Sequence, residues 1–417
     1  MSENQTCVVV GASHAGVNFA FALRKAGWQG SIKLFDADPS LPYHRPPLSK
    51  AYLTSADAID KNLLKAAETY QKDDIGLNLG VKVGSIERTA QVLQLENGEQ
   101  VAFDKLVIAT GARPFIPPIE GLDSASNLYP LRTAQDVENI RQAFAHSAQK
   151  RVVIIGGGYI GLETAASLKK LGGEVTVLER EQRILARVTA PYMSDYFQRL
   201  HADNGVTVAT SKNVVRIETT DGENSVQCDD GTHYPADIII VGVGIRVNTE
   251  LAAQAGIEID NGIKVNAQAQ TSDENIYAIG DCTYHYNPHY QRFIRLESVQ
   301  NAVDQAKVAA ASICGQEVEY DTLPWFWSDQ YDVKLQMVGL SQGYTDILVR
   351  DENEPNKFSV WYFKGDELLA VDAVNNAKAY VVATKFIKSG EQIDKAKLVD
   401  ASVEFKPANL LSRVQVR

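Results

Sequence analysis

One short pattern, an apolar run that ends in a glycine-rich turn, occurs twice in this chain and restricts its fold more than any other feature. The first copy is 7–16 (CVVVGASHAG) and the second is 152–161 (VVIIGGGYIG). Each copy continues through an amphipathic stretch to a second apolar run, at 32–36 (IKLFD) and at 175–179 (VTVLE). A strand, a helix that begins at a glycine turn and a second strand form a β-α-β unit. The repeat therefore predicts two similar α/β halves.

The repeat extends beyond the two β-α-β units. Each half continues through a small β-meander, at 92–104 or 226–237, into an apolar return strand that ends at Gly111 or Gly244. We predict an α/β fold with two tandem Rossmann-like dinucleotide-binding domains. Three glycines recur at one spacing of 145 positions: Gly11, Gly16 and Gly27 match Gly156, Gly161 and Gly172.

The pattern changes after Pro324. Short apolar segments separated by turns replace the β-α-β pattern, and one segment of helical spacing ends near Gly390. The predicted result is a C-terminal α+β domain with antiparallel strands. The predicted strands are 345–350, 358–363 and 367–374, and the predicted helix is 377–388.

The second glycine turn is a complete G-x-G-x-x-G motif, formed by Gly156, Gly158 and Gly161. Glycine permits the tight turn and the close approach of a pyrophosphate, and the helix that follows offers free N–H groups to this anion. Glu179 ends the next strand, where a carboxylate can hold a ribose 2′-hydroxyl. Because a carboxylate there would repel a 2′-phosphate, NADH is favoured over NADPH, although two arginines follow within four residues.

The first glycine turn departs from the motif, since Ser13 stands between Gly11 and Gly16 where the second copy has a glycine. Serine is small enough for a pyrophosphate to approach, so we interpret this unit as a second dinucleotide site. Asp36 takes the ribose-binding place, with Ala37 beside it. A degenerate unit that binds nothing is the alternative.

A third segment, 271–282, has the form of a strand that ends in Gly280-Asp281. A carboxylate in this place can hold a polyhydroxyl chain such as the ribitol of a flavin, and a plain turn is the alternative. In a chain that already has two nucleotide-binding units, the segment indicates FAD. A second dinucleotide domain inserted into a first is a common construction in flavoproteins that use two cofactors.

These segments together resemble a known family, the FAD-dependent NADH:ferredoxin reductases of bacterial oxygenase systems. The resemblance rests on 45–53 (RPPLSKAYL), 155–163 (IGGGYIGLE), 295–299 (RLESV) and 325–331 (WFWSDQY). It extends from about residue 7 to about residue 375. The tryptophan-containing segment is specific to this group, whereas the glycine motifs are shared with all pyridine-nucleotide flavoproteins.

The resemblance implies a glutathione-reductase-like fold in three parts. FAD would bind 1–113 together with 246–324, NADH would bind the inserted 114–245, and 325–417 would form the C-terminal α+β domain. The implied FAD-binding residues are Gly11, Ser13, Ala15, Gly16, Asp36, Ala37, Arg45, Lys50, Val83, Ala109, Thr110, Gly111, Arg132, Gly280, Asp281, Glu297, Ser298, Val299 and Trp327. The implied NAD-binding residues are Gly156, Gly158, Tyr159, Ile160, Gly161, Glu163, Glu179, Gly242 and Gly244.

The resemblance also implies a reaction, in which NADH gives a hydride to FAD and single electrons pass to a 2Fe-2S ferredoxin. Lys50 and Glu163 would lie beside the junction of flavin and nicotinamide as an ion pair, and Trp327 would lie against the flavin ring. The cofactors carry this chemistry, so no nucleophilic triad is expected. The alternatives are a surface lysine at position 50 and a core aromatic side chain at position 327.

The implied partner is a 2Fe-2S ferredoxin that feeds an oxygenase, docked near Trp325, Trp327 and Arg295. An acidic ferredoxin would be attracted by a basic patch, although charged stretches often only face solvent. The cationic residues considered for this patch are Arg292, Arg295, Lys385 and Lys388.

Overall charge and hydropathy exclude other classes of partner. The chain has 41 Lys and Arg against 52 Asp and Glu, a net charge of −11, which argues against nucleic-acid binding. No apolar run approaches the ~18 residues of a simple membrane span. The first residues show neither the cationic nor the apolar region of a secretory signal, so we expect a cytoplasmic protein.

The cysteines argue against dithiol chemistry. Cys7, Cys228, Cys282 and Cys314 form no C-x-x-C pair, and none lies in 40–50. Disulfide reductases and single-cysteine NADH oxidases or peroxidases of the same superfamily are therefore disfavoured.

No metal site is predicted. His285 and His289 are four positions apart, which is a possible ligand spacing, but Pro288 between them indicates a loop rather than a helix. Two alternative functions stay open beside ferredoxin reduction. One is a rubredoxin reductase, which differs only in its acceptor, and the other is an NADH-sensing flavoprotein that resembles apoptosis-inducing factor.

Overall fold

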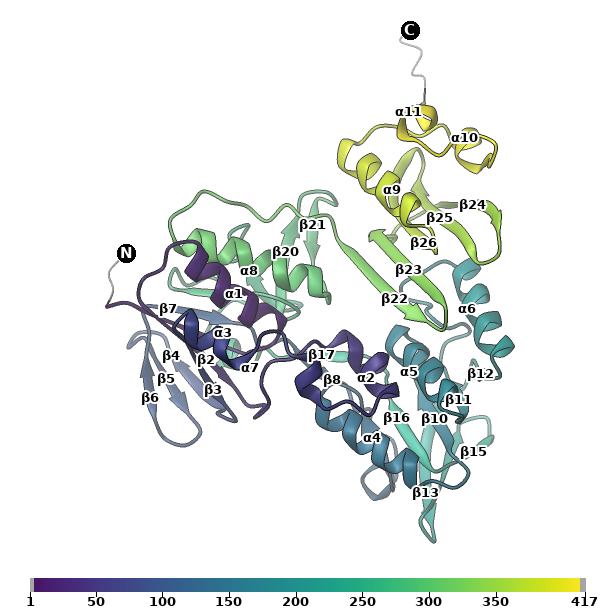
Figure 1. Ribbon diagram of the computed structural model, residues 1–417, viewed down its shortest axis with the longest axis horizontal. Coiled ribbons are helices and arrows are strands. Elements are labelled where there is room, and N and C mark those ends of the chain that lie inside the picture. The colour runs from purple at the N-terminus through teal and green to yellow at the C-terminus, as the bar shows by residue number, and fades with distance from the viewer. Residues whose placement is uncertain (1–3, 413–417) are drawn as a thin grey trace. The chain divides into compact units, whose positions relative to one another are not determined.

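The computed structural model describes residues 4–412 and divides them into two compact units (Figure 1). Unit 1 comprises residues up to 44, 57–113 and 245–324, and unit 2 comprises 45–56, 114–244 and the residues from 325 onward. No helix within 4–412 is long and apolar enough to cross a membrane.

Unit 1 is built on a parallel sheet of order β19-β7-β1-β2-β3. Helices α1 and α8 lie side by side on one face, where Cys7 and Val9 of β1 join the core (Figure 1). Val8 and Val10 join a second core, which the β-meander and α7 share. The elements are β1 (Thr6–Val10), α1 (His14–Lys25), β2 (Ser31–Asp36), η2 (Ile59–Asn62), α3 (Ala67–Lys72), β3 (Ile75–Leu79), β7 (Lys105–Ile108), α7 (Glu250–Gln254), β19 (Ile276–Ala278) and α8 (Val299–Ile313).

Unit 2 repeats this sheet in the order β9-β16-β10-β11-β12, again with parallel pairings. Strands β10, β11 and β16 correspond to β1, β2 and β7, as the repeat predicts. The edge strand beside β16 is β9, which lies between the two copies of the repeat in the chain, whereas the edge strand beside β7 is β19, which follows the second copy. The elements are η3 (Leu122–Ser124), β9 (Leu128–Pro130), α4 (Ala134–His146), β10 (Arg151–Ile155), α5 (Tyr159–Lys170), β11 (Glu174–Leu178), α6 (Pro191–Asp203), β12 (Thr207–Ala209) and β16 (Ile238–Val241).

Small sheets complete both halves. The predicted meanders form, and their turn residues Gly98 and Gly231 have φ of 88° and 83°. Asp104 and Asp237 occupy equivalent places, where each carboxylate accepts the first backbone N–H of the central strand, from Thr6 and from Arg151. The strands are β4 (Val83–Glu87), β5 (Val92–Leu95), β6 (Gln100–Ala102), β13 (Val214–Thr220), β14 (Glu223–Cys228), β15 (His233–Ala236), β18 (Ile263–Val265), β20 (Thr283–Asn287) and β21 (Arg292–Ile294), and β8 (Ala112–Pro114) pairs with β17 (Ile245–Val247).

The C-terminal part of unit 2 is an antiparallel sheet of order β22-β23-β26-β25-β24 with α9 against it (Figure 1). The three predicted strands and the predicted helix are confirmed, and α9 ends at Gly390 with φ of 67°. Strands β22 and β23 were not among the predicted strands. The elements are β22 (Trp325–Gln330), β23 (Val333–Gly339), β24 (Asp346–Glu354), β25 (Lys357–Lys364), β26 (Glu367–Val374), α9 (Ala377–Ser389), α10 (Lys395–Val399) and α11 (Pro407–Leu410).

The short segment 45–56 belongs to unit 2 although it lies between two parts of unit 1 in the chain. It forms η1 (Pro46–Ser49) and α2 (Ala51–Thr54). The Tyr52 hydroxyl donates to Glu138 on α4 at 2.6 Å, and the Arg141 guanidinium lies 4.0 Å from the Tyr52 ring centre. These contacts attach the segment to α4.

A buried polar cluster joins the C-terminal sheet to the loop before α6. Asp372 on β26 is 4% exposed and accepts hydrogen bonds from Thr189 at 2.7 Å and from Tyr362. The Tyr362 oxygen also accepts the Ala190 N–H at 3.1 Å. Burial raises the pKa of Asp372 from 3.8 to about 6. The cluster therefore holds a carboxylate whose charge is costly in the folded state.

The pH dependence of unfolding should report this cost. Between the unfolded pKa near 3.8 and the folded pKa near 6, the native state binds a proton that the unfolded state has lost, so Asp372 makes the protein less stable as pH rises. Asp372→Asn carries no charge, so its stability relative to wild type should rise by roughly 3 kcal/mol between pH 4 and pH 7. Urea unfolding at several pH values measures this difference, and a difference that does not change with pH would contradict it.

Candidate functional site

The first glycine turn follows β1 in unit 1. Gly11 has φ of 108°, and a Cβ there would overlap the carbonyl of Ala109, so only glycine fits. Ser13 is the N-cap residue of α1. Asp36 lies at the end of β2, where it accepts the N–H of Ala12 at 2.6 Å and that of Asp38 at 2.9 Å. The turn thus brings a helix N-terminus and an oriented carboxylate together.

The predicted Gly280-Asp281 turn lies at the same edge of the sheet, next to the first glycine turn. Gly280 approaches Ala15 so closely that a Cβ at 280 would lie 3.1 Å from the Ala15 Cβ. Gln305 on α8 holds the turn, because its Oε1 accepts the Gly280 N–H at 2.8 Å and the Thr283 hydroxyl at 3.0 Å. Gln305 was not among the predicted residues. It lies 25 positions from Gly280 in the chain, so no short sequence pattern links the two residues.

Most of the other residues predicted for FAD in unit 1 lie at this edge too. Ala109, Thr110 and Gly111 directly follow β7, and the Thr110 hydroxyl donates to the main chain of Asn248 at 2.7 Å. Ser298 is the N-cap residue of α8. Val83 begins β4 and lies in the second core of unit 1. Gly16 lies in the first turn of α1, Ala37 follows β2, Glu297 precedes Ser298, and Val299 begins α8.

The second glycine turn, in unit 2, repeats the first in detail. Gly156 has φ of 113°, and a Cβ there would overlap the carbonyl of Gly242, the equivalent of Ala109. Glu179 follows β11 and accepts the Gly157 N–H at 2.7 Å, as Asp36 accepts that of Ala12. Gly158, at the N-cap of α5, has open space around its Cβ position. This space explains how Ser13 is accommodated at the matching place.

The first turn of α5 presents two more predicted residues. The Tyr159 hydroxyl contacts the Met337 sulfur at 3.0 Å, and its ring lies 5.4 Å from that of Phe326. Ile160 is 46% exposed although it is large and apolar. Gly244, which follows β16, has φ of 118°.

Glu163, one helical turn further along α5, is the centre of a buried polar cluster. It is 3% exposed, and its Oε2 accepts the Lys50 ammonium at 2.7 Å and the Ser49 hydroxyl at 2.6 Å. Its Oε1 accepts the Ser328 hydroxyl at 2.7 Å. The predicted ion pair is therefore present. The two serines were not predicted, since they lie 114 and 165 positions from Glu163.

The other predicted residues of unit 2 lie around this cluster and on β22. Arg45 donates to the main-chain carbonyl of Arg132. Trp327 on β22 is half-buried, and its ring centre lies 5.4 Å from that of Trp325. Arg295 belongs to unit 1, where it pairs with Glu297.

The two turns fit the pyrophosphates of FAD and NADH. In each turn, the first glycine packs against the neighbouring strand with no room for a side chain. The helix that follows offers the free N–H groups of its first turn to a phosphate. Asp36 and Glu179 each keep acceptor capacity for ribose hydroxyls beyond the backbone N–H groups they bind. Unit 1 would hold FAD, since it alone has the Gly280-Asp281 turn, and the second Rossmann-like sheet would hold NADH.

The cysteines are unsuited to redox chemistry. Cys7, Cys228 and Cys282 are buried and Cys314 is half-buried. Burial raises the pKa of each thiol, that of Cys282 to about 11. The reactive form of cysteine is the thiolate, which these surroundings disfavour at neutral pH.

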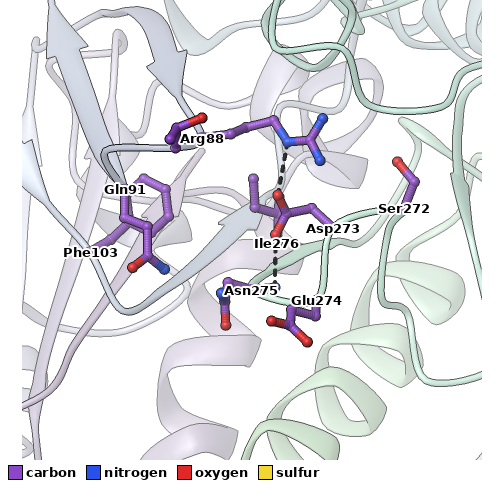
Figure 2. Close-up of a pocket in the computed structure, with 9 residues that line it drawn as sticks. Arg88, Gln91, Phe103, Ser272, Asp273, Glu274, Asn275 and Ile276 are labelled. Carbon is purple, nitrogen blue, oxygen red and sulfur yellow. Dashed lines mark hydrogen bonds and ion pairs between the residues drawn. The ribbon is translucent and has the colours of Figure 1, made fainter.

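A polar cavity of about 480 Å³ in unit 1 lies apart from these residues (Figure 2). It is located near the amino ends of β7 and β19, and Arg88 spans part of it in an ion pair with Asp273 at 2.8 Å. Ligands of parallel α/β sheets bind at the carboxyl ends of the strands, so this cavity is not the dinucleotide site. His285 and His289 also have separate partners, Gln305 and Asp321.

Comparison with known proteins agrees with the geometry. Residues 5–306 match the family described as pyridine nucleotide-disulphide oxidoreductase, and 325–409 match the reductase C-terminal family. The chain belongs to the pyridine nucleotide-disulphide oxidoreductase family. The match to 409 corrects the predicted limit of the resemblance, which extends well beyond residue 375.

Individual relatives cover almost the whole chain. Putidaredoxin reductase from Pseudomonas putida is 42% identical over 97% of both chains. A rubredoxin-NAD(+) reductase from the same species is 39% identical over 89% of this chain and 96% of its own. The crystal structure of a covalent putidaredoxin reductase–putidaredoxin complex matches with a TM-score of 0.93 and 41% identity, over 97% of this chain and 98% of that chain. The predicted family and the predicted fold class are thereby confirmed.

Substitution of the two equivalent carboxylates should separate the two cofactors. Asp36→Ala should weaken FAD binding about tenfold or more while NADH binding stays near wild type, because a charged hydrogen-bond acceptor for a ribose is lost. Glu179→Ala should weaken NADH binding by a similar factor and leave FAD binding unchanged. Fluorescence titration of each dinucleotide measures both effects, and equal loss of both cofactors in either variant would contradict the assignment.

Proposed function

We propose that this protein is an FAD-containing, NADH-dependent ferredoxin reductase whose 2Fe-2S partner supplies electrons to an oxygenase. One observation carries the proposal: the same turn, helix N-terminus and carboxylate occur once in each unit, which provides for two dinucleotides. When bound, FAD would accept a hydride from NADH and release two electrons singly. We place the reaction in the cytoplasm.

The residues of the chain would bind and orient rather than react. Lys50 carries a positive charge that Glu163 holds at 2.7 Å, and the lysine side chain is still 20% exposed. A cation fixed in this way can stabilise negative charge that develops near it. Trp327 would offer an aromatic surface for stacking. Neither role requires a thiol, in agreement with the buried cysteines.

The acceptor is supported by the relatives and by a basic surface in unit 2. Putidaredoxin reductase has been crystallised in a covalent complex with putidaredoxin. In this protein, α9 has no acidic residue, and its exposed face carries Lys378, Val381, Lys385 and Lys388. The ring centre of Tyr380, on the same helix, lies 6.0 Å from that of Trp325, so the helix that carries the lysines contacts the strand of the two tryptophans. This surface suits an acidic partner, although the chain as a whole is acidic.

A rubredoxin reductase is the second candidate, since a relative of that name is 39% identical. The two candidates share every cofactor-binding residue and differ in the one-electron carrier alone. An NADH-sensing flavoprotein would also share these residues but would turn over slowly.

NADH-driven cytochrome c reduction by the FAD-loaded protein distinguishes these functions. The protein is assayed with no carrier, with several 2Fe-2S ferredoxins and with rubredoxins, while oxygen uptake is recorded. We expect strong dependence on one 2Fe-2S ferredoxin, little oxygen uptake in its absence, and a rate that falls as salt rises because docking is electrostatic.

The other outcomes each contradict the proposal in a different way. Dependence on a rubredoxin alone would replace ferredoxin as the partner. Rapid oxygen uptake that no carrier affects would indicate an oxidase. Flavin that is reduced by NADH but is not reoxidised by any carrier would favour the sensor.

A further inference from the structure

A chain of buried hydrogen bonds leads from Glu163 to the far end of α6. Beyond Ser328, which donates to Glu163, the Gln330 amide donates to the Ser328 oxygen at 3.3 Å. The Gln330 carbonyl oxygen lies 2.8 Å from Nε2 of His201 on α6. Nδ1 of His201 lies 3.1 Å from the Tyr331 hydroxyl. Ser328, Gln330 and His201 are each at most 1% exposed.

The carboxylate at one end determines the direction of every bond in this chain. Glu163, paired with the Lys50 ammonium, has no hydrogen to give, so the Ser328 hydroxyl must donate to it. The Ser328 oxygen then accepts, and Gln330 must present its NH₂ group there and its carbonyl to His201. His201 therefore carries its hydrogen on Nε2, and its bare Nδ1 accepts from Tyr331.

The histidine itself fits this arrangement. Burial lowers the pKa of His201, so the ring is neutral at pH 7 and has one hydrogen to place. A neutral imidazole gives one hydrogen bond and accepts one, which matches its two partners. Hydrogen bonds that all point the same way polarise one another, and here all of them point toward the negative charge.

We propose that His201, Gln330 and Ser328 are positioning residues for Glu163, and that their aligned hydrogen bonds hold its carboxylate in the orientation that fixes Lys50. This inference rests on the proposed function for the part that Lys50 plays beside the cofactors. The alignment of the hydrogen bonds, in contrast, follows from the structure alone and can be measured without the cofactors.

The first measurement is the tautomer of His201, read by ¹⁵N NMR of the histidine-labelled protein at pH 7.5. The signal is assigned as the one that is missing in His201→Gln. We expect hydrogen on Nε2 alone in wild type and a mixture of tautomers in Ser328→Ala, where Gln330 is free to turn over. Tyr196→Phe is the matched control, since it removes a hydrogen bond from α6 to Asn356 at 3.0 Å that lies outside the chain of bonds, and it should leave the tautomer unchanged.

The second measurement is the rate of flavin absorbance loss after anaerobic mixing with NADH. Ser328→Ala, which removes a hydrogen bond to the charged Glu163, should slow it by about tenfold, and His201→Leu should slow it by up to the same factor through Ser328. Because His201 acts through Ser328, the double variant should be no slower than Ser328→Ala alone. His201→Gln, which keeps one donor and one acceptor, should restore the rate, and Tyr196→Phe should not change it.

Several results would overturn the inference. Hydrogen on Nδ1 of His201 in wild type, or a tautomer that Ser328→Ala leaves unchanged, would show that Glu163 does not direct the chain of bonds. Additive rate effects in the double variant would show that His201 acts by another route. If NADH does not reduce the flavin of the wild-type protein, the proposed function fails, while the NMR result still decides the direction of the hydrogen bonds.

Discussion

The structure depends on a close approach of backbone to backbone at the end of the central strand in each half. Gly11 meets the carbonyl of Ala109, and Gly156 meets that of Gly242, with no room for a Cβ in either place. This approach lets the chain turn directly from the strand into α1 or α5. The free N–H groups of the helix and the carboxylate of the next strand, Asp36 or Glu179, then lie around one space. A single steric constraint thus produces both candidate dinucleotide sites.

A second constraint is the burial of charge in unit 2. Glu163 is stabilised by a cation and two hydroxyls that come from η1, from the residue after it and from β22. Because a buried carboxylate without partners is costly, moving any of these segments away from Glu163 would be unfavourable. The same cluster that positions Lys50 therefore also attaches the C-terminal sheet to α5. Asp372, which among residues 4–412 has hydroxyl partners but no cationic partner, makes a similar attachment at a cost that depends on pH.

The sequence predicted those features whose signals are local or repeated. The glycine turns, Asp36, Glu179 and the Gly280-Asp281 turn follow from short patterns, and in unit 1 the structure brings Gly11, Asp36 and Gly280 to one sheet edge. Arg45, Lys50, Arg132 and Trp327, also predicted for FAD, belong to unit 2. The Lys50–Glu163 pair came from the family resemblance, since nothing in the 113 positions that separate the two residues signals it. Ser328, Gln330 and His201 could not be predicted, because a serine or histidine that faces a distant partner has no periodicity. Strand β22 was missed because its tryptophans were interpreted as a docking surface, and β23, which pairs with it, was not predicted.

In the function proposed for this protein, NADH bound to one half of the repeat would give a hydride to FAD bound to the other half. Anaerobic stopped-flow absorbance with NADH deuterated at one or the other C4 position tests this transfer most directly. We predict that one equivalent of NADH removes the flavin absorbance and that deuterium at only one of the two positions slows this loss, because a nicotinamide bound in one orientation presents one face. Loss of absorbance that neither deuterium slows, or no loss at all, would contradict direct hydride transfer.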